Sequence, residues 1–140
     1  MFQAKLDHVA IACLDPEKLK RVLAIIGCED KGTEVVPTQE VVTHFLKPEY
    51  NEKQQVTLLE LLVPTTKDSV IAKFLDKKGP GFHHISFQVK NLEKLMALLL
   101  KNNVRLVYEK QQEGAHSTRV NFIHPESTGG ILIEISEKIS

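Results

Sequence analysis

The sequence has no net charge, only two cysteines and no long apolar run. Its 140 residues carry 18 basic and 18 acidic side chains. Because a nucleic-acid-binding surface must neutralise phosphates, this balance argues against that class of protein. No stretch approaches the roughly 20 apolar residues that span a bilayer, so we expect no membrane-spanning segment.

The same scarcity applies to targeting and cross-linking signals. The first ten residues lack the basic segment followed by an apolar one that marks a signal peptide. Cys13 and Cys28 are too few for a disulfide framework, and we expect two buried, reduced thiols. Together these features favour a cytoplasmic protein.

What is present is an ordinary globular composition, with 42% apolar and 26% charged residues. The length predicts a single domain over residues 1–140. The most turn-rich stretch is 76–81, Asp-Lys-Lys-Gly-Pro-Gly, and it divides the chain near its middle.

The two halves repeat each other at a shift of 76 residues. A strand is expected at 6–13 in the first half and at 82–89 in the second, and Asp15 and Asn91 follow as helix N-caps. Each cap precedes the tripeptide Glu-Lys-Leu at the same offset, and Pro16 occupies a favoured first helical position. Self-similarity at a fixed shift indicates a duplicated unit whose copies share a core.

Each copy is predicted to be a βαβββ module. Module one covers about 4–66, a connecting helix about 68–78, and module two about 81–137. The three later strands of the modules are expected at 33–36, 41–47 and 55–63, and at 104–108, 119–123 and 130–136.

Strand alternation selects one histidine from each module. Side chains at i and i+2 share a face, so Val9 and Ile11 face the helix while His8 faces the other way. In the second copy, His83 takes the helix side and His84 the opposite face, which makes His84 the equivalent of His8.

The last strand of each module carries one acidic residue between aliphatic neighbours. These residues are Glu60 and Glu134, 74 positions apart. A buried carboxylate is costly unless it is paired or ligated. A lone strand histidine is commonly a core residue and a lone glutamate commonly an edge residue, but four such residues at duplicated positions predict a shared divalent cation. Two imidazoles and two carboxylates suit six-coordinate Co²⁺, Mn²⁺ or Ni²⁺ better than a closed tetrahedral Zn²⁺ site, and ligand counting does not choose among them. We favour Co²⁺, with Mn²⁺, Ni²⁺ or Zn²⁺ as alternatives.

A paired βαβββ chain with these residues resembles the vicinal-oxygen-chelate superfamily and, within it, the methylmalonyl-CoA epimerase family. The resemblance covers about residues 5–137 and includes the segments Leu-Asp-His-Val-Ala-Ile-Ala at 6–12, Glu-Val-Val-Pro-Thr-Gln at 34–39, Glu-Leu-Leu-Val-Pro at 60–64, Asp-Ser-Val-Ile-Ala-Lys-Phe-Leu at 68–75, Gly-Phe-His-His-Ile at 81–85, Gly-Ala-His at 114–116 and Phe-Ile-His-Pro-Glu-Ser-Thr-Gly-Gly-Ile-Leu-Ile-Glu at 122–134. It implies an α+β fold, an open, cup-shaped, eight-stranded mixed sheet around a metal held by His8, Glu60, His84 and Glu134.

The resemblance also implies an isomerase that interconverts (R)- and (S)-methylmalonyl-CoA through a metal-stabilised enolate. Its partner would be an acyl-CoA thioester substrate, and a homodimer is expected. Because epimerisation needs proton transfer on both faces of a carbon, two acid/base groups are required. Glu134 is the first candidate, and Glu60 or Glu40 is the second.

One position departs from the family pattern. Some members carry a catalytic glutamate on the strand after the Val-Pro-x-Gln segment, where an ungapped reading places Thr43. Either Glu40 occupies the catalytic position in place of Thr43, another group serves as the base, or this chain catalyses a different reaction. The alternatives are a glyoxalase I-like lactoylglutathione lyase, a ring-cleaving iron dioxygenase, or a non-catalytic small-molecule-binding member of the superfamily.

Overall fold

The computed structural model describes residues 2–50 and 56–139. The chain divides into two compact units, one formed by His8–His83 and the other by Met1–Asp7 together with His84–Ser140. Within the described residues each unit holds four hydrogen-bonded strands, in the orders β2-β3-β4-β1 and β5-β8-β7-β6.

The unit formed by His8–His83 contains most of the first βαβββ copy and the connecting helix. Its elements are β1 (Lys5–Ala12, which begins in the other unit), α1 (Pro16–Ile26), β2 (Cys28–Val36), β3 (Val41–Pro48), β4 (Leu58–Pro64) and α2 (Val70–Lys78). β1 pairs with β4 in parallel, and β4 pairs with β3, and β3 with β2, in antiparallel fashion.

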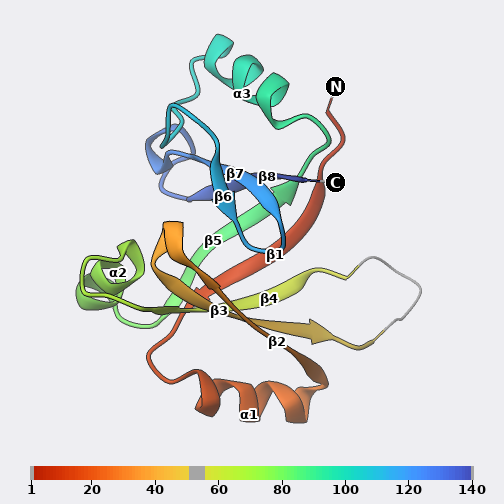
Figure 1. Cartoon of the computed structure of the whole chain (residues 1–140), viewed down its shortest axis with the longest axis vertical. Helices are drawn as coiled ribbons and strands as arrows, with labels where there is room; N and C mark the ends of the chain where they lie inside the picture. Colours follow the sequence, from red (N-terminus) through yellow and green to blue (C-terminus); the bar gives the residue numbers. More distant parts are fainter. Residues whose placement is uncertain (1, 51–55, 140) are drawn as a thin grey trace. The chain divides into compact units, whose positions relative to one another are not determined.

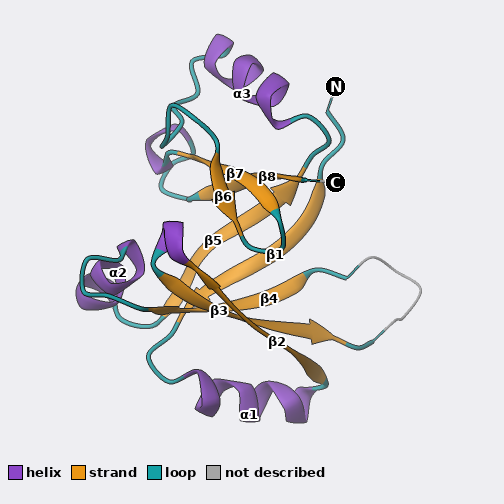
Figure 2. Cartoon of the chain, viewed as in Figure 1, coloured by secondary structure: helices purple, strands orange, loops and turns teal. Residues whose placement is uncertain are grey.

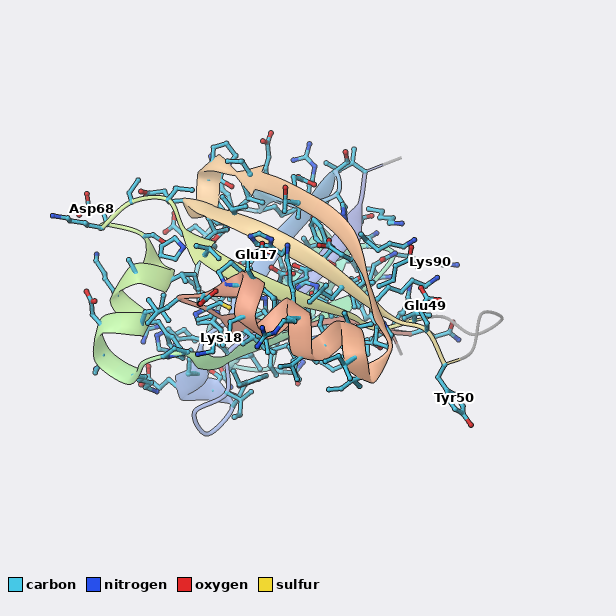
Figure 3. All side chains as sticks on the ribbon, turned by 90° about the horizontal axis from the view of Figure 1, so that it is seen from below. Glu17, Lys18, Glu49, Tyr50, Asp68 and Lys90 are labelled. Atoms are coloured by element: carbon cyan, nitrogen blue, oxygen red, sulfur yellow. The ribbon has the colours of Figure 1, made fainter. Side chains whose placement is uncertain are left out.

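Helix α1 covers one face of these strands (Figure 1). Leu19 and Leu23 of the helix pack against a buried cluster of Cys13, Leu46 and Leu61. Removing a leucine side chain from water stabilises the fold by roughly 2 kcal/mol, so this cluster holds the helix on the sheet. The opposite side of α1 is exposed and carries Glu17 and Lys18 (Figure 3).

The other unit contains the second copy. Its elements are β5 (Gly81–Gln88, which begins in the first unit), α3 (Leu92–Lys101), β6 (Gln112–Gly114), β7 (Thr118–Ile123) and β8 (Ile133–Lys138). β5 pairs with β8 in parallel, and β8 pairs with β7, and β7 with β6, in antiparallel fashion. Leu92 and Met96 of α3 pack with Ile135 of β8, so this unit also has a helix on one sheet face (Figure 2).

The shared topology confirms the predicted duplication and the α+β class. In each copy the first strand lies parallel to the last, the module helix packs on one face, and the remaining strands follow in antiparallel order. Both predicted N-caps are confirmed, because Asp15 accepts a hydrogen bond from the backbone N–H of Lys18 and Asn91 accepts one from Lys94, each at 3.0 Å.

One predicted strand is wrong. Residues 104–108 form only an isolated β-bridge, between Leu106 and Ile123. The strand that follows the helix in this module is instead β6, at Gln112–Gly114. The reason lies in Asn121, whose fully buried side-chain amide donates to the carbonyl of Tyr108 at 3.0 Å and accepts from its N–H at 3.2 Å. A side chain therefore bonds the backbone groups that a longer strand ladder would have used.

Three strand starts also differ from the prediction by three residues or more. The strand expected at 33–36 begins at Cys28. The strand expected at 55–63 begins at Leu58, and residue 55 lies outside the described residues. The strand expected at 130–136 begins at Ile133, because Gly129 and Gly130 have φ values of +74° and +111° and belong to the preceding turn.

Both cysteines are free thiols, as expected, but only Cys13 is buried as predicted, and Cys28 is half-buried. Burial raises the pKa of the Cys13 thiol. In the part of the chain that the structure describes, no helix is long and apolar enough to cross a membrane.

The helix cap at Asp15 provides a test of the first module. Asp15→Ala removes the acceptor for the Lys18 N–H and should lower the free energy of unfolding by about 1 kcal/mol, measured by urea denaturation. Asp15→Asn is the matched control, because its amide oxygen can accept the same bond, and it should remain close to the unaltered protein. Equal loss in both variants would contradict the role of the cap.

Candidate metal centre

His8 and Glu60 meet on the sheet face that α1 does not cover. His8 lies on β1, and Glu60 is the partner of Ala10 in the β1–β4 register, two residues further along. The Nδ1 atom of His8 lies 3.0 Å from Oε2 of Glu60. The predicted alternation therefore holds in this unit, since Ile11 and Cys13 pack on the helix side.

Burial makes this pair chemically significant. His8 is 5% exposed and Glu60 is 6% exposed. A carboxylate with so little access to water is destabilised by several kcal/mol unless a positive charge, hydrogen-bond donors or a metal compensates it. The imidazole supplies a direct partner, and both groups are ligands that divalent transition metals accept.

The second unit contains the equivalent pair. Nε2 of His84 on β5 lies 3.9 Å from Oε2 of Glu134 on β8, and both side chains are largely buried. The ring of Phe122, the neighbour of Glu134 on β7, contacts the His84 ring edge-to-face at 5.5 Å between centroids. Packing by Phe122 restricts the imidazole to one orientation.

Ser86 is a member of this group that the sequence did not identify. It is fully buried, pairs with Glu134 in the β5–β8 register, and donates its hydroxyl to Oε1 of Glu134 at 2.7 Å. One carboxylate oxygen is thus held by Ser86 while the other faces His84. The signal available in the sequence was position, because Ser86 shares the face of His84 two residues later.

His83 lies on the other face of β5, as its place in the alternation predicts. Its ring contacts Phe74 of α2 edge-to-face at 5.0 Å. Burial lowers the pKa of His83 to about 4. The side chain therefore packs as a neutral ring against the connecting helix, on the face of β5 opposite to the one that carries His84.

Glu40 lies far along the strand from Glu60. Its carboxylate accepts a hydrogen bond from the hydroxyl of Thr66, and its carbonyl accepts one from the backbone N–H of Thr65. Glu60 is paired with Phe45, five residues from Glu40. At about 3.3 Å per residue, this distance is roughly 16 Å. The geometry of this unit gives no support to Glu40 as an acid/base group.

Each pair, taken by itself, has a spacing that a divalent cation can bridge. Ligand atoms about 2.1 Å from one ion and about 90° apart are separated by about 3.0 Å, which equals the distance between His8 and Glu60. The 3.9 Å between His84 and Glu134 is also within the roughly 4.2 Å that two such bonds can span. A set of imidazole nitrogens and carboxylate oxygens suits a metal that accepts mixed ligands and leaves positions open for substrate.

Known proteins are similar to this chain in both sequence and fold. A family model described as the glyoxalase/bleomycin resistance protein/dioxygenase superfamily matches residues 7–122. The chain is 36% identical over 135 residues to the mitochondrial methylmalonyl-CoA epimerase of Homo sapiens, which covers 95% of this chain and 73% of the relative.

Two solved structures extend the likeness to the backbone. Methylmalonyl-CoA epimerase from Mycobacterium tuberculosis is 34% identical with a TM-score of 0.86, over 96% of this chain and 88% of that chain. A variant of Streptomyces coelicolor methylmalonyl-CoA epimerase in complex with 2-nitronate-propionyl-CoA is 32% identical with a TM-score of 0.87, over 97% and 98% of the two chains.

The Ser86 hydroxyl should matter for metal binding. Ser86→Ala leaves Oε1 of Glu134 without its donor, and groups that orient a ligand typically change metal affinity by about 10- to 100-fold. We expect weaker Co²⁺ binding by titration calorimetry. Ser136→Ala is the control, because that buried hydroxyl on β8 donates to the carbonyl of Phe87 instead. Unchanged Co²⁺ affinity in Ser86→Ala would contradict the assigned role.

Proposed function

The chain belongs to the glyoxalase/bleomycin resistance protein/dioxygenase superfamily, and from that premise we propose that it is an epimerase that interconverts (R)- and (S)-methylmalonyl-CoA. The observation that carries the proposal is the repeated His–Glu pair. One pair lies on β1 and β4 and the other on the equivalent strands β5 and β8, in a chain aligned along 95% of its length with an epimerase.

His8, Glu60, His84 and Glu134 are the proposed ligands of a divalent metal ion, chosen for their equivalent positions in the repeat. A mixed set of nitrogen and oxygen ligands suits six-coordinate Co²⁺, Mn²⁺ or Ni²⁺, and of these Co²⁺ is the ion we favour. When bound, the ion would act as a Lewis acid that stabilises the negative charge of a thioester enolate. The support is the equivalence of the four positions in the repeat, the burial of His8, Glu60 and His84, and the 12% exposure of the Glu134 side chain.

Glu134 is proposed to transfer the α-proton on one face of the substrate carbon. Its Oε1 atom is held by Ser86, so the carboxylate is oriented before substrate arrives. Oε2 of Glu60 lies 3.0 Å from Nδ1 of His8, and Glu60 is proposed as a metal ligand and not as a proton-transfer group.

The remaining parts of the proposal concern partners and location. The substrate class is an acyl-CoA thioester, since a relative of the same fold binds 2-nitronate-propionyl-CoA. A single domain over 1–140, a homodimer and a cytoplasmic location remain predictions from the sequence, and the human relative is described as mitochondrial.

Substrate comparison separates this function from its alternatives. Purified protein would be incubated in D₂O with methylmalonyl-CoA, with and without Co²⁺, and deuterium at the α-carbon would be followed by NMR. The same preparation would be offered the glutathione hemithioacetal of methylglyoxal and, aerobically with iron, a catechol. Turnover of the hemithioacetal or the catechol in place of methylmalonyl-CoA would replace the epimerase proposal with the lyase or dioxygenase.

The clearest single substitution is Glu134→Ala. It removes a proposed ligand and the proposed proton-transfer group, so both Co²⁺ affinity and deuterium exchange at the α-carbon should fall, the latter by at least about 100-fold. Glu126→Ala, which removes an exposed carboxylate of the same unit that pairs with Arg105, should leave both unchanged. Full exchange in Glu134→Ala would refute the assignment.

A further inference from the structure

A second carboxylate lies on the sheet face that carries His8 and Glu60. The strand register traces this face across β4, β3 and β2. Glu60 is paired with Phe45, Thr43 follows Phe45 by two residues on the same face, and Thr43 is paired with Glu34. Directly paired residues of antiparallel strands point to the same side, so Glu34 and Glu60 share it.

A bulge in β2 places Glu34 there. The register between β2 and β3 shifts between Asp30 and Thr33, so that Asp30 is paired with Leu46 but Thr33 with His44. Without the extra residue, Thr33 would face Thr43 and Glu34 would point to the side that α1 covers. Gly32 makes the bulge possible with φ of +98°, and the Asp30 carboxylate accepts its N–H at 2.8 Å.

The surroundings of Glu34 differ from those of an ordinary surface glutamate. Its cross-strand neighbour Thr43 is 2% exposed, and Val36 and Phe45 on the same face are also buried. Glu34 itself is half-buried. Thr43 lies diagonally from Glu60 at about 7–8 Å, and Glu34 is one strand, about 4.8 Å, beyond Thr43. A side chain as long as glutamate can therefore approach a substrate held next to Glu60.

Other carboxylates of this unit are less suitable. Glu60 is itself a proposed metal ligand, and Glu40 lies roughly 16 Å along the strand from Glu60. Glu29 also belongs to β2, but its side chain is 52% exposed and pairs with Lys31 at 3.3 Å. The hydrogen bond with Glu49, followed by that with Lys31, holds the pKa of Glu29 below its usual value and makes this carboxylate a weaker base.

We propose that Glu34 is the second proton-transfer residue of the epimerisation, an inference that rests on the proposed function. The Glu34 carboxylate takes the α-proton of one stereoisomer, so that the C–H bond breaks, an O–H bond forms, and the electron pair moves into the enolate. A second carboxyl group then donates a proton to the opposite face of the carbon. Exchange of both carboxyl groups with water restores the starting protonation.

Glu34→Gln tests this assignment, because glutamine retains the shape of the side chain and cannot take the proton. Each stereoisomer of methylmalonyl-CoA would be incubated separately in D₂O with the Co²⁺-loaded protein. We expect interconversion to fall by at least about 100-fold. Exchange without inversion should persist for the stereoisomer whose α-proton faces the second proton-transfer group, and Co²⁺ affinity, measured by calorimetry, should not change.

Glu29→Gln is the matched control on the same strand, and it should interconvert the stereoisomers at the rate of the unaltered protein. Normal interconversion by Glu34→Gln would overturn the inference, as would the same loss in Glu29→Gln, since the effect would then be one of general charge. Loss of exchange from both stereoisomers in Glu34→Gln would also overturn it. If the unaltered protein exchanged neither stereoisomer, the proposed function itself would fail, and this inference with it.

Discussion

The burial of a carboxylate beside an imidazole is the constraint on which the rest of the structure depends. His8 and Glu60 lie 3.0 Å apart with 5% and 6% of their surfaces exposed. Such a pair persists only where the surrounding sheet holds both groups in register, because an unpaired buried charge costs several kcal/mol. The α1 helix and the apolar cluster beneath it keep β1 and β4 in that register, so packing on one face supports the chemistry of the other.

The two copies of the module share one arrangement of strands, helix and His–Glu pair, with small differences. Each copy has a first strand parallel to its last strand, a capped helix on one face and a His–Glu pair on the other. In the second copy Ser86 binds the glutamate and the separation from the histidine is 3.9 Å, whereas in the first the glutamate bonds directly to the histidine. This asymmetry is consistent with the proposal that Glu134 moves a proton while Glu60 is a ligand.

Much of the fold could be predicted because it follows from local rules. Asp15 and Asn91 begin helices since their side chains satisfy free backbone donors, and period-two alternation separates His84 from His83 without knowledge of any neighbour. The strand expected at 104–108 failed for a non-local reason. The buried amide of Asn121 binds the backbone of Tyr108, and no pattern within 104–108 reveals that contact.

The sequence by itself determined which residue of each strand faces away from the helix, because alternation and repeat length are properties of the chain alone. Tertiary structure decided which of those residues are neighbours. Register depends on hydrogen bonds between strands and on the bulge between Asp30 and Thr33, and a one-residue shift moves every following side chain to the other face. That shift places Glu34 opposite Thr43, and the parallel pairing of β5 with β8 places Ser86 against Glu134.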